Sequence, residues 1–234
     1  MLRLFVPETP SPDGTLRIPR GELRHLHALR LAAGDRLRVF DETGREYEVV
    51  LEHVTTRAAT GRVVASYPPP HESPLELVLV AALVKHDKMD WVIEKATELG
   101  VTRIAPVMTR YTVARGAHLE RWRRIAIAAA KQCGRTRIPS VDTPRAFDDA
   151  IGESWPGLRL LAWEDEGTVR LADLPQRTRA VTLVIGPEGG FDPAEVATAR
   201  SAAFVTVSLG RRVLRAETAA VVGTALCQHR WGDG

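Results

Sequence analysis

Two glycine-containing loops, each placed directly after a short apolar strand, constrain the fold of this chain more than any other feature. Residues 181–185 read Val-Thr-Leu-Val-Ile, the apolar and β-branched run of a strand buried on both faces of a parallel sheet. Residues 186–191 read Gly-Pro-Glu-Gly-Gly-Phe, which ends the strand and allows backbone conformations closed to other residues. The loop therefore lies at the carboxyl end of a strand, where open α/β sheets bind ligands.

A helix is predicted immediately after this loop. Asp192 is a good N-cap, Pro193 suits the first helical position, and Glu195 completes a capping box. This pattern fixes the order strand, glycine loop, helix.

A second buried strand, residues 204–209, runs into Gly210 and a basic segment at residues 211–218. Two such loops after two strands predict one small-molecule pocket built largely from backbone. The first loop lacks the Gly-Lys-Ser/Thr of a phosphate-binding loop, and Glu188 inside it would repel phosphate. A neutral or cationic nucleoside therefore fits better than a triphosphate.

The chain divides at the proline-rich linker of residues 67–74. We expect a β-rich domain at residues 1–70 and an α/β domain at residues 71–234. The first domain is predicted to hold a helix at residues 22–31, a hairpin of residues 36–40 and 46–51, and a strand at residues 61–66. In the second domain strands alternate with helices, which indicates a mostly parallel sheet covered on both faces. Its expected strands are residues 75–84, 103–108, 158–163, 181–185 and 204–209, and its helices 90–99, 119–133, 144–152 and 217–230.

Composition places few limits on function. The 234 residues are 44% hydrophobic and 26% charged, and the net charge of +3 is compatible with nucleic acid without implying it. Cys133 and Cys227 form neither a disulfide framework nor a zinc set, and no histidines have metal-ligand spacing, so no metal is expected. The start of the chain lacks the apolar core of a signal peptide, and the longest apolar run, residues 75–84, is too short to cross a bilayer. We expect a cytoplasmic protein with no membrane partner.

One stretch is strongly basic. Between residues 110 and 137 eight Lys or Arg face one acidic residue. These charges form a solvated helix face or contact RNA phosphates. The candidates for RNA contacts are Arg110, Arg115, Arg121, Arg124 and Arg137.

Residues 186–191, taken with Leu-Gly-Arg-Arg-Val-Leu-Arg-Ala-Glu-Thr-Ala at residues 209–219, resemble the signature of the RsmE-type 16S ribosomal RNA (uracil-N3)-methyltransferases of the SPOUT superfamily. Residues 95–101, 128–135 and 25–35 resemble patterns of the same family. The resemblance implies a PUA-like amino-terminal barrel and a carboxyl-terminal α/β domain with a trefoil knot. It also implies S-adenosylmethionine as methyl donor with S-adenosylhomocysteine as product, a homodimer, and 16S rRNA or the small ribosomal subunit as partner.

The resemblance also points to site residues. Expected around the methyl donor are Leu161, Trp163, Ile185, Gly186, Pro187, Glu188, Gly189, Gly190, Leu209, Gly210, Arg212, Val213, Leu214 and Ala216. Uridine N3 carries a proton that must leave before methylation, so the site needs a base, or a cation that stabilises the uracil anion. Glu217 or Glu188 is the candidate base, and Arg215 or Arg135 the candidate cation; alternatively, the glutamates only hold the loops through backbone amides.

The expected function is methylation of uridine N3 in 16S rRNA. Two alternatives stay open at this point. A related 2′-O-ribose or tRNA methyltransferase would share the glycine loops, and a non-catalytic RNA-binding assembly factor would keep the fold without binding the methyl donor.

Overall fold

The structure, a computed structural model, describes residues 2–68, 72–114 and 116–234. The chain forms two compact units. One comprises Met1–Glu72 with Ala130–Ile138, and the other comprises Ser73–Ala129 with Pro139–Gly234; they are called the N-terminal and C-terminal units. The predicted domain boundary, between residues 70 and 71, lies outside the described residues.

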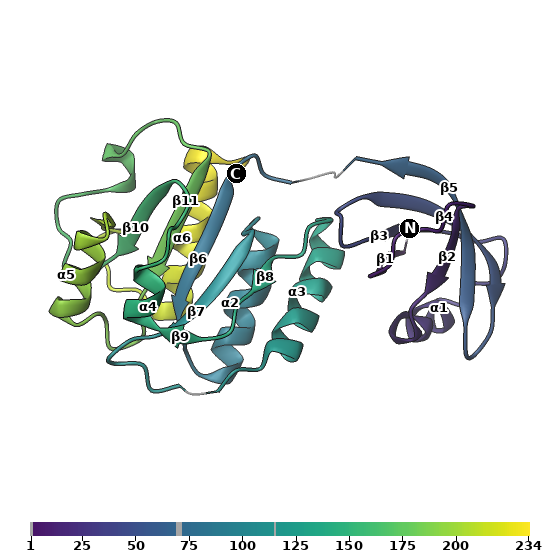
Figure 1. The fold of residues 1–234 in the computed structure, drawn as a ribbon, viewed down its shortest axis with the longest axis horizontal. Coiled ribbons are helices and arrows are strands. Elements are labelled where there is room, and N and C mark those ends of the chain that lie inside the picture. The colour runs from purple at the N-terminus through teal and green to yellow at the C-terminus, as the bar shows by residue number, and fades with distance from the viewer. Residues whose placement is uncertain (1, 69–71, 115) are drawn as a thin grey trace. The chain divides into compact units, whose positions relative to one another are not determined.

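A five-stranded sheet with the strand order β1-β3-β4-β5-β2 forms the N-terminal unit (Figure 1). Its core consists of alternating inward-facing residues, among them Leu37, Val39 and Val49. This alternation is what a sheet with one buried face requires. The elements are β1 (Arg3–Phe5), β2 (Thr15–Ile18), the short 3₁₀ helix Arg20–Glu22, α1 (Leu23–Ala28), β3 (Arg36–Phe40), β4 (Glu46–Val54) and β5 (Ala59–Tyr67).

The predicted hairpin is confirmed, since β3 and β4 pair antiparallel with Arg36 opposite Val50. The helix predicted at residues 22–31 is shorter than expected and ends at Ala28. Arg30 has a φ of 56°, a left-handed conformation that stops helical hydrogen bonding.

Residues 130–138 are distant in sequence but belong to the N-terminal unit. The Glu72 carboxylate anchors them. It accepts hydrogen bonds from Arg135 Nη2 at 3.0 Å and from the backbone N–H groups of Thr136 and Arg137 at 3.0 and 2.8 Å. Lys131 Nζ also donates to Glu22 at 2.8 Å. The end of one helix and the following loop are thereby built into the β-rich unit.

A sheet of parallel strands forms the C-terminal unit, in the order β12-β10-β11-β6-β7-β8 with β9 also paired to β7. All of its strand pairs are parallel. The elements are β6 (Glu76–Ala82), α2 (His86–Glu98), β7 (Arg103–Met108), α3 (Leu119–Cys133), β8 (Ser140–Val141), β9 (Arg145–Ala146), α4 (Phe147–Ile151), β10 (Leu158–Ala162), the 3₁₀ helix Leu171–Asp173, β11 (Ala180–Ile185), α5 (Pro193–Ser201), β12 (Val205–Val207) and α6 (Ala216–Trp231).

Helices cover both faces of this sheet (Figure 1). Val80 and Val184 pack with α4 and α5 on one face. On the other face Gly223 of α6 lies so close to Leu183 of β11 that an added Cβ would stand 2.8 Å from the Leu183 side chain. Strands covered on both sides are nearly continuously apolar, as β6 is after Glu76 and β11 is apart from Thr182. The expected parallel α/β unit, preceded by a small β-rich unit, is confirmed.

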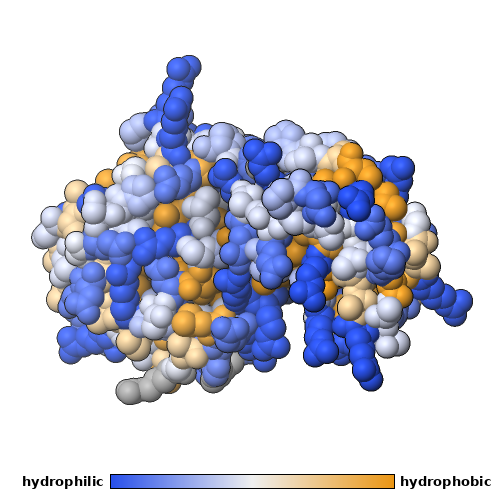
Figure 2. Space-filling view, turned by 45° about the vertical axis from the view of Figure 1, so that its right-hand side comes forward, coloured by the Kyte–Doolittle hydropathy of each residue, from blue (hydrophilic) through white to orange (hydrophobic). Residues whose placement is uncertain are grey.

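Two predicted helices have different starts. The helix expected at residues 144–152 is preceded by β9, because Arg145 pairs with Val107 of β7; α4 is therefore only Phe147–Ile151. The helix expected at residues 90–99 begins earlier, at His86, where no capping side chain marks its start. No helix within the described part of the chain is long and apolar enough to cross a membrane. The face shown in Figure 2 is mostly hydrophilic, with hydrophobic residues in scattered areas.

Candidate active site

Three neighbouring strands of the C-terminal unit end at one pocket. β10, β11 and β12 are adjacent in the sheet, so the segments that follow them meet at its carboxyl edge. Trp163 follows β10, the first glycine loop follows β11, and the second glycine loop follows β12. The pocket is lined by Ala162, Trp163, Glu164, Ile185, Gly186, Pro187, Glu188, Gly190, Ser208, Leu209, Gly210, Arg211, Arg212, Val213, Leu214, Ala216 and Ala219. The two glycine loops therefore share a single cavity.

The first loop requires glycine for two different reasons. Gly190 has a φ of +72°, and a Cβ there would stand 2.0 Å from Glu164 Oε1. Gly186 is not left-handed, but a Cβ there would stand 2.9 Å from the Phe191 ring. The predicted capping box closes the loop: Asp192 accepts from the Ala194 N–H at 2.9 Å, and Glu195 accepts from the Asp192 N–H at 2.9 Å. The Ala194 N–H holds the pKa of the Asp192 carboxyl below its ordinary value.

The second loop lines the cavity and carries backbone donors that no described residue uses. Gly210 has a φ of +134°, with open space where its side chain would be. No described residue accepts a hydrogen bond from the backbone N–H groups of residues 211–214. Leu209 and Leu214 add apolar surface beside these donors. A wall of uncommitted N–H groups and aliphatic side chains is suited to a flat heterocycle with ring-nitrogen acceptors.

The structure brings together twelve of the fourteen residues expected around the methyl donor. The other two are Leu161 and Gly189. Leu161 is fully buried in the core on the side of α4 and α5. Gly189 does not line the pocket. A Cβ added at Gly189 would stand 3.0 Å from the Cβ of Tyr111. The pocket is also lined by five residues that were not predicted from the sequence: Ala162, Glu164, Ser208, Arg211 and Ala219. The position of Glu164 directly after a buried strand was a usable signal.

The two candidate bases meet at one lysine, Lys88, which the sequence analysis did not single out. Its Nζ lies 3.3 Å from Glu188 Oε1 and 3.1 Å from Glu217 Oε1. The hydrogen bond with Glu217 raises the pKa of the Lys88 ammonium, with a smaller contribution from Glu188. Lys88 is therefore protonated and neutralises part of the acidic charge beside the pocket.

The two candidate cations differ in placement. Arg215 is exposed and provides the N-cap residue of α6, directly before Ala216 of the pocket. Arg135 belongs to the N-terminal unit, where its side chain is only 4% exposed and its Nη2 pairs with Glu72 at 3.0 Å. A guanidinium held in a buried ion pair serves stability, so the structure gives Arg135 a structural partner.

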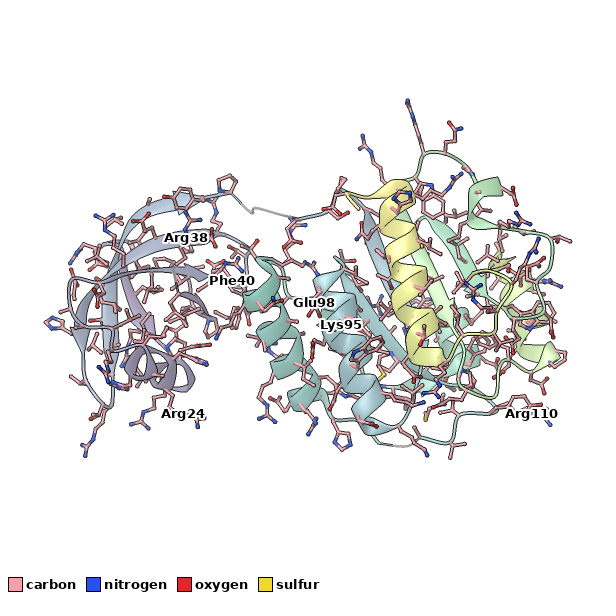
Figure 3. The ribbon with its side chains drawn as sticks, turned by 180° about the vertical axis from the view of Figure 1, so that it is seen from behind. Arg24, Arg38, Phe40, Lys95, Glu98 and Arg110 are labelled. Atoms are coloured by element: carbon pink, nitrogen blue, oxygen red, sulfur yellow. The ribbon has the colours of Figure 1, made fainter. Side chains whose placement is uncertain are left out.

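The candidate RNA contacts are at the surface. Arg110 and Arg121 have exposed side chains that pair with Asp192 and Asp90 at 3.2 and 2.7 Å. Arg110 is labelled in Figure 3, on the segment after β7. Arg124 and Arg137 are also exposed, and Arg115 lies outside the described residues. Among the described residues no group of three or more His, Cys, Asp or Glu side chains is placed to hold a metal ion.

The family model described as an RNA methyltransferase domain matches residues 71–228, and one described as an RNA methyltransferase PUA domain matches residues 18–64. With the parallel sheet, the glycine-built pocket and the small β-rich unit, these matches define an RNA methyltransferase of the SPOUT class. A relative from Mycobacterium bovis, named ribosomal RNA small subunit methyltransferase E, is 33% identical over 97% of this chain and 93% of its own length. The chain belongs to the ribosomal RNA small subunit methyltransferase E family, as the sequence resemblance predicts.

Solved structures agree over the whole chain. Ribosomal RNA small subunit methyltransferase E from Neisseria gonorrhoeae, bound to S-adenosyl methionine, is 32% identical with a TM-score of 0.93 and covers 100% of this chain and 99% of that one. A putative methyltransferase from Legionella pneumophila, also in complex with this cofactor, is 30% identical with a TM-score of 0.92 and the same coverage.

Proposed function

We propose that this protein transfers the methyl group of S-adenosylmethionine to N3 of a uridine in the 16S rRNA of the small ribosomal subunit. The observation that carries the proposal is the shared pocket of the two glycine loops. It lies in a chain that matches a methyltransferase solved with this donor at a TM-score of 0.93. The 2′-O-ribose and tRNA alternatives have no comparable support, since the named relatives act on small-subunit rRNA.

The pocket residues fit this donor. Leu209 and Leu214 would flank the adenine, and the backbone N–H groups of residues 211–214 would bind its nitrogens. Gly186 and Gly190 add no side chains of their own to the part of the pocket that the first loop lines. When bound, S-adenosylmethionine supplies a methyl group on a positively charged sulfur. The acceptor would attack the methyl carbon in line with the departing sulfur. The contribution of the protein is to align donor and acceptor.

The residues beside the pocket handle the N3 proton. We propose Glu217 or Glu188 as the acceptor of that proton: Glu188 lines the pocket, Glu217 directly follows the lining residue Ala216, and both pair with Lys88. Arg215 stabilises the negative charge that develops on the uracil. Arg135 is not proposed for this role, because Glu72 holds it in the N-terminal unit.

We further propose that the β-rich unit and the exposed arginines Arg110, Arg121, Arg124 and Arg137 bind rRNA phosphates. Residues 1–70 then form the RNA-binding domain and residues 71–234 the catalytic domain. The proposed acting form is a homodimer in the cytoplasm, where the small subunit is assembled. The family membership supports these proposals, and sedimentation of the purified protein tests the dimer.

Transfer of labelled methyl to small subunits tests the function. Subunits lacking the modification should accept label, and mass analysis of the nucleosides should find it as 3-methyluridine. Subunits that already carry the modification are the control and should accept none. Label at a ribose oxygen would indicate the related 2′-O chemistry. No label, together with no binding of S-adenosylhomocysteine in calorimetry, would indicate a non-catalytic factor.

A further inference from the structure

Lys88 joins three segments that are far apart in the sequence. It lies in the first turn of α2, and its ammonium contacts Glu188 of the first glycine loop and Glu217 in the first turn of α6. The side chain of Glu217 is 14% exposed, that of Lys88 28% and that of Glu188 42%. Water therefore screens the Lys88–Glu217 pair less than an ordinary surface ion pair.

The two glutamates differ in their relation to the pocket. Glu188 lines it, and Glu217 directly follows a lining residue, Ala216. Two carboxylates within reach of one ammonium repel each other when that cation is removed. Each then adopts the rotamer that separates it from the other, and the glycine loop loses its tie to α2.

We propose that Lys88 is a positioning residue for methyl transfer: its ammonium fixes the carboxylates of Glu188 and Glu217 beside the pocket, so that the base stands where the uridine N3 proton arrives. This inference rests on the proposed function. Lys88 acts through the glutamates and does not itself touch the donor pocket. Its removal therefore slows proton removal more than it weakens binding.

The chain offers a matched control on the same helix. Lys95 also lies between two glutamates, with its Nζ 2.7 Å from Glu94 and 2.9 Å from Glu98, and its side chain is 30% exposed. Figure 3 shows Lys95 and Glu98 on α2. Seven residues, or about 10 Å along the helix, separate it from Lys88, and its partners are both on α2. The two lysines thus share composition and exposure but differ in contact with the pocket segments.

The experiment compares Lys88→Met, Lys88→Arg and Lys95→Met in steady-state methyl transfer to unmodified small subunits. We expect Lys88→Met to lower kcat by about 10- to 100-fold, since a small displacement of a reacting group has effects of this size. KM for the subunit and the calorimetric Kd for S-adenosylhomocysteine should change less than about threefold. Lys88→Arg, which keeps the cation, should have a kcat within about fivefold of that of the unchanged protein. Lys95→Met should have the same kcat as the unchanged protein.

A second measurement does not depend on turnover. In a double-mutant cycle of thermal unfolding, Lys88→Met and Glu217→Gln should be non-additive, because they remove the same interaction. Additive effects on the unfolding midpoint would show that the lysine does not hold Glu217, and would overturn the proposal.

The remaining outcomes distinguish a failure of the role of Lys88 from a failure of the proposed function. If the unchanged protein transfers methyl and Lys88→Met keeps its kcat, the role of Lys88 is wrong and the proposed function stands. Equal losses of kcat in Lys88→Met and Lys95→Met would also refute it, since they would indicate a general effect on α2. If the unchanged protein transfers no methyl, the proposed function fails and the role of Lys88 fails with it.

Discussion

Gly190, in the first glycine loop, has a left-handed backbone conformation that favours glycine. Its φ is +72°, and a Cβ there would meet Glu164 Oε1 at 2.0 Å. The contacted atom is the end of a flexible side chain that can swing away, so the steric contact costs little. The left-handed backbone remains, and for an L-residue it costs about 1–2 kcal/mol.

A matched control isolates this cost. Gly167 lies in the same unit, is outside the left-handed region, and has nothing within 4 Å of the point where a Cβ would stand. Replacing either glycine by alanine reduces the entropy of the unfolded chain by the same amount, about 0.4–1 kcal/mol in favour of folding. The free energies of unfolding of Gly190→Ala and Gly167→Ala should therefore differ only by the cost of the left-handed backbone, about 1–2 kcal/mol. For a chain of this length it corresponds to about 2–8 °C in the unfolding midpoint.

The assay is thermal unfolding of both variants, followed by calorimetry with S-adenosylhomocysteine. Gly190→Ala should unfold below Gly167→Ala by the stated interval. It should also bind at least tenfold more weakly, since the displaced Glu164 side chain lines the pocket. Equal midpoints with unchanged affinity would refute the argument that this loop is built around a left-handed glycine.

Three further predictions follow from individual side chains. Arg135→Met should destabilise the N-terminal unit by about 1–3 kcal/mol, because the 11% exposed Glu72 carboxylate loses its cation but keeps two backbone N–H donors. The affinity for S-adenosylhomocysteine should stay unchanged, and a stable variant that lost activity would show that Arg135 acts in catalysis. Hydrogen bonds from Thr206 and Thr168 lower the pKa of Glu166 from 4.5 to about 2. The ionised carboxylate therefore stabilises the folded protein fully above about pH 4.5, and this contribution is lost as the pH falls toward 2. Glu166→Gln should flatten the loss of stability across that interval, and an unchanged acid profile would contradict this. Burial raises the pKa of the Cys227 thiol to about 12, so at about pH 8 a thiol reagent should modify Cys133 and leave Cys227 unreacted in the native protein.

Much of the fold was predictable because its signals are local. The capping box of Asp192 and Glu195 and the glycines at residues 186–190 each depend on neighbours within a few residues. The same is true of α3, whose bounds match the predicted 119–133. Local chemistry placed the two loops at strand ends, and the adjacency of β10, β11 and β12 brought them to one cavity.

The parts that could not be predicted depend on long-range contacts. Lys88 meets Glu188 and Glu217 across separations of 100 and 129 residues, and nothing in the sequence near Lys88 signals either partner. Arg135 and Glu72 are 63 residues apart. The run of basic residues at 110–137 therefore gives no sign of which arginine is buried in an ion pair and which are exposed. Leu161 and Ala162 are neighbours on one strand, and the choice of which faces the pocket depends on the register of the sheet.

The most direct measurement is a crystal structure of the protein with S-adenosylhomocysteine. The ligand should lie between residues 186–190 and residues 209–214, with its adenine against Leu209 and Leu214 and hydrogen-bonded to the backbone of the second loop. A ligand bound elsewhere on the chain, or a cavity between the loops that stays closed at saturating ligand, would contradict the account.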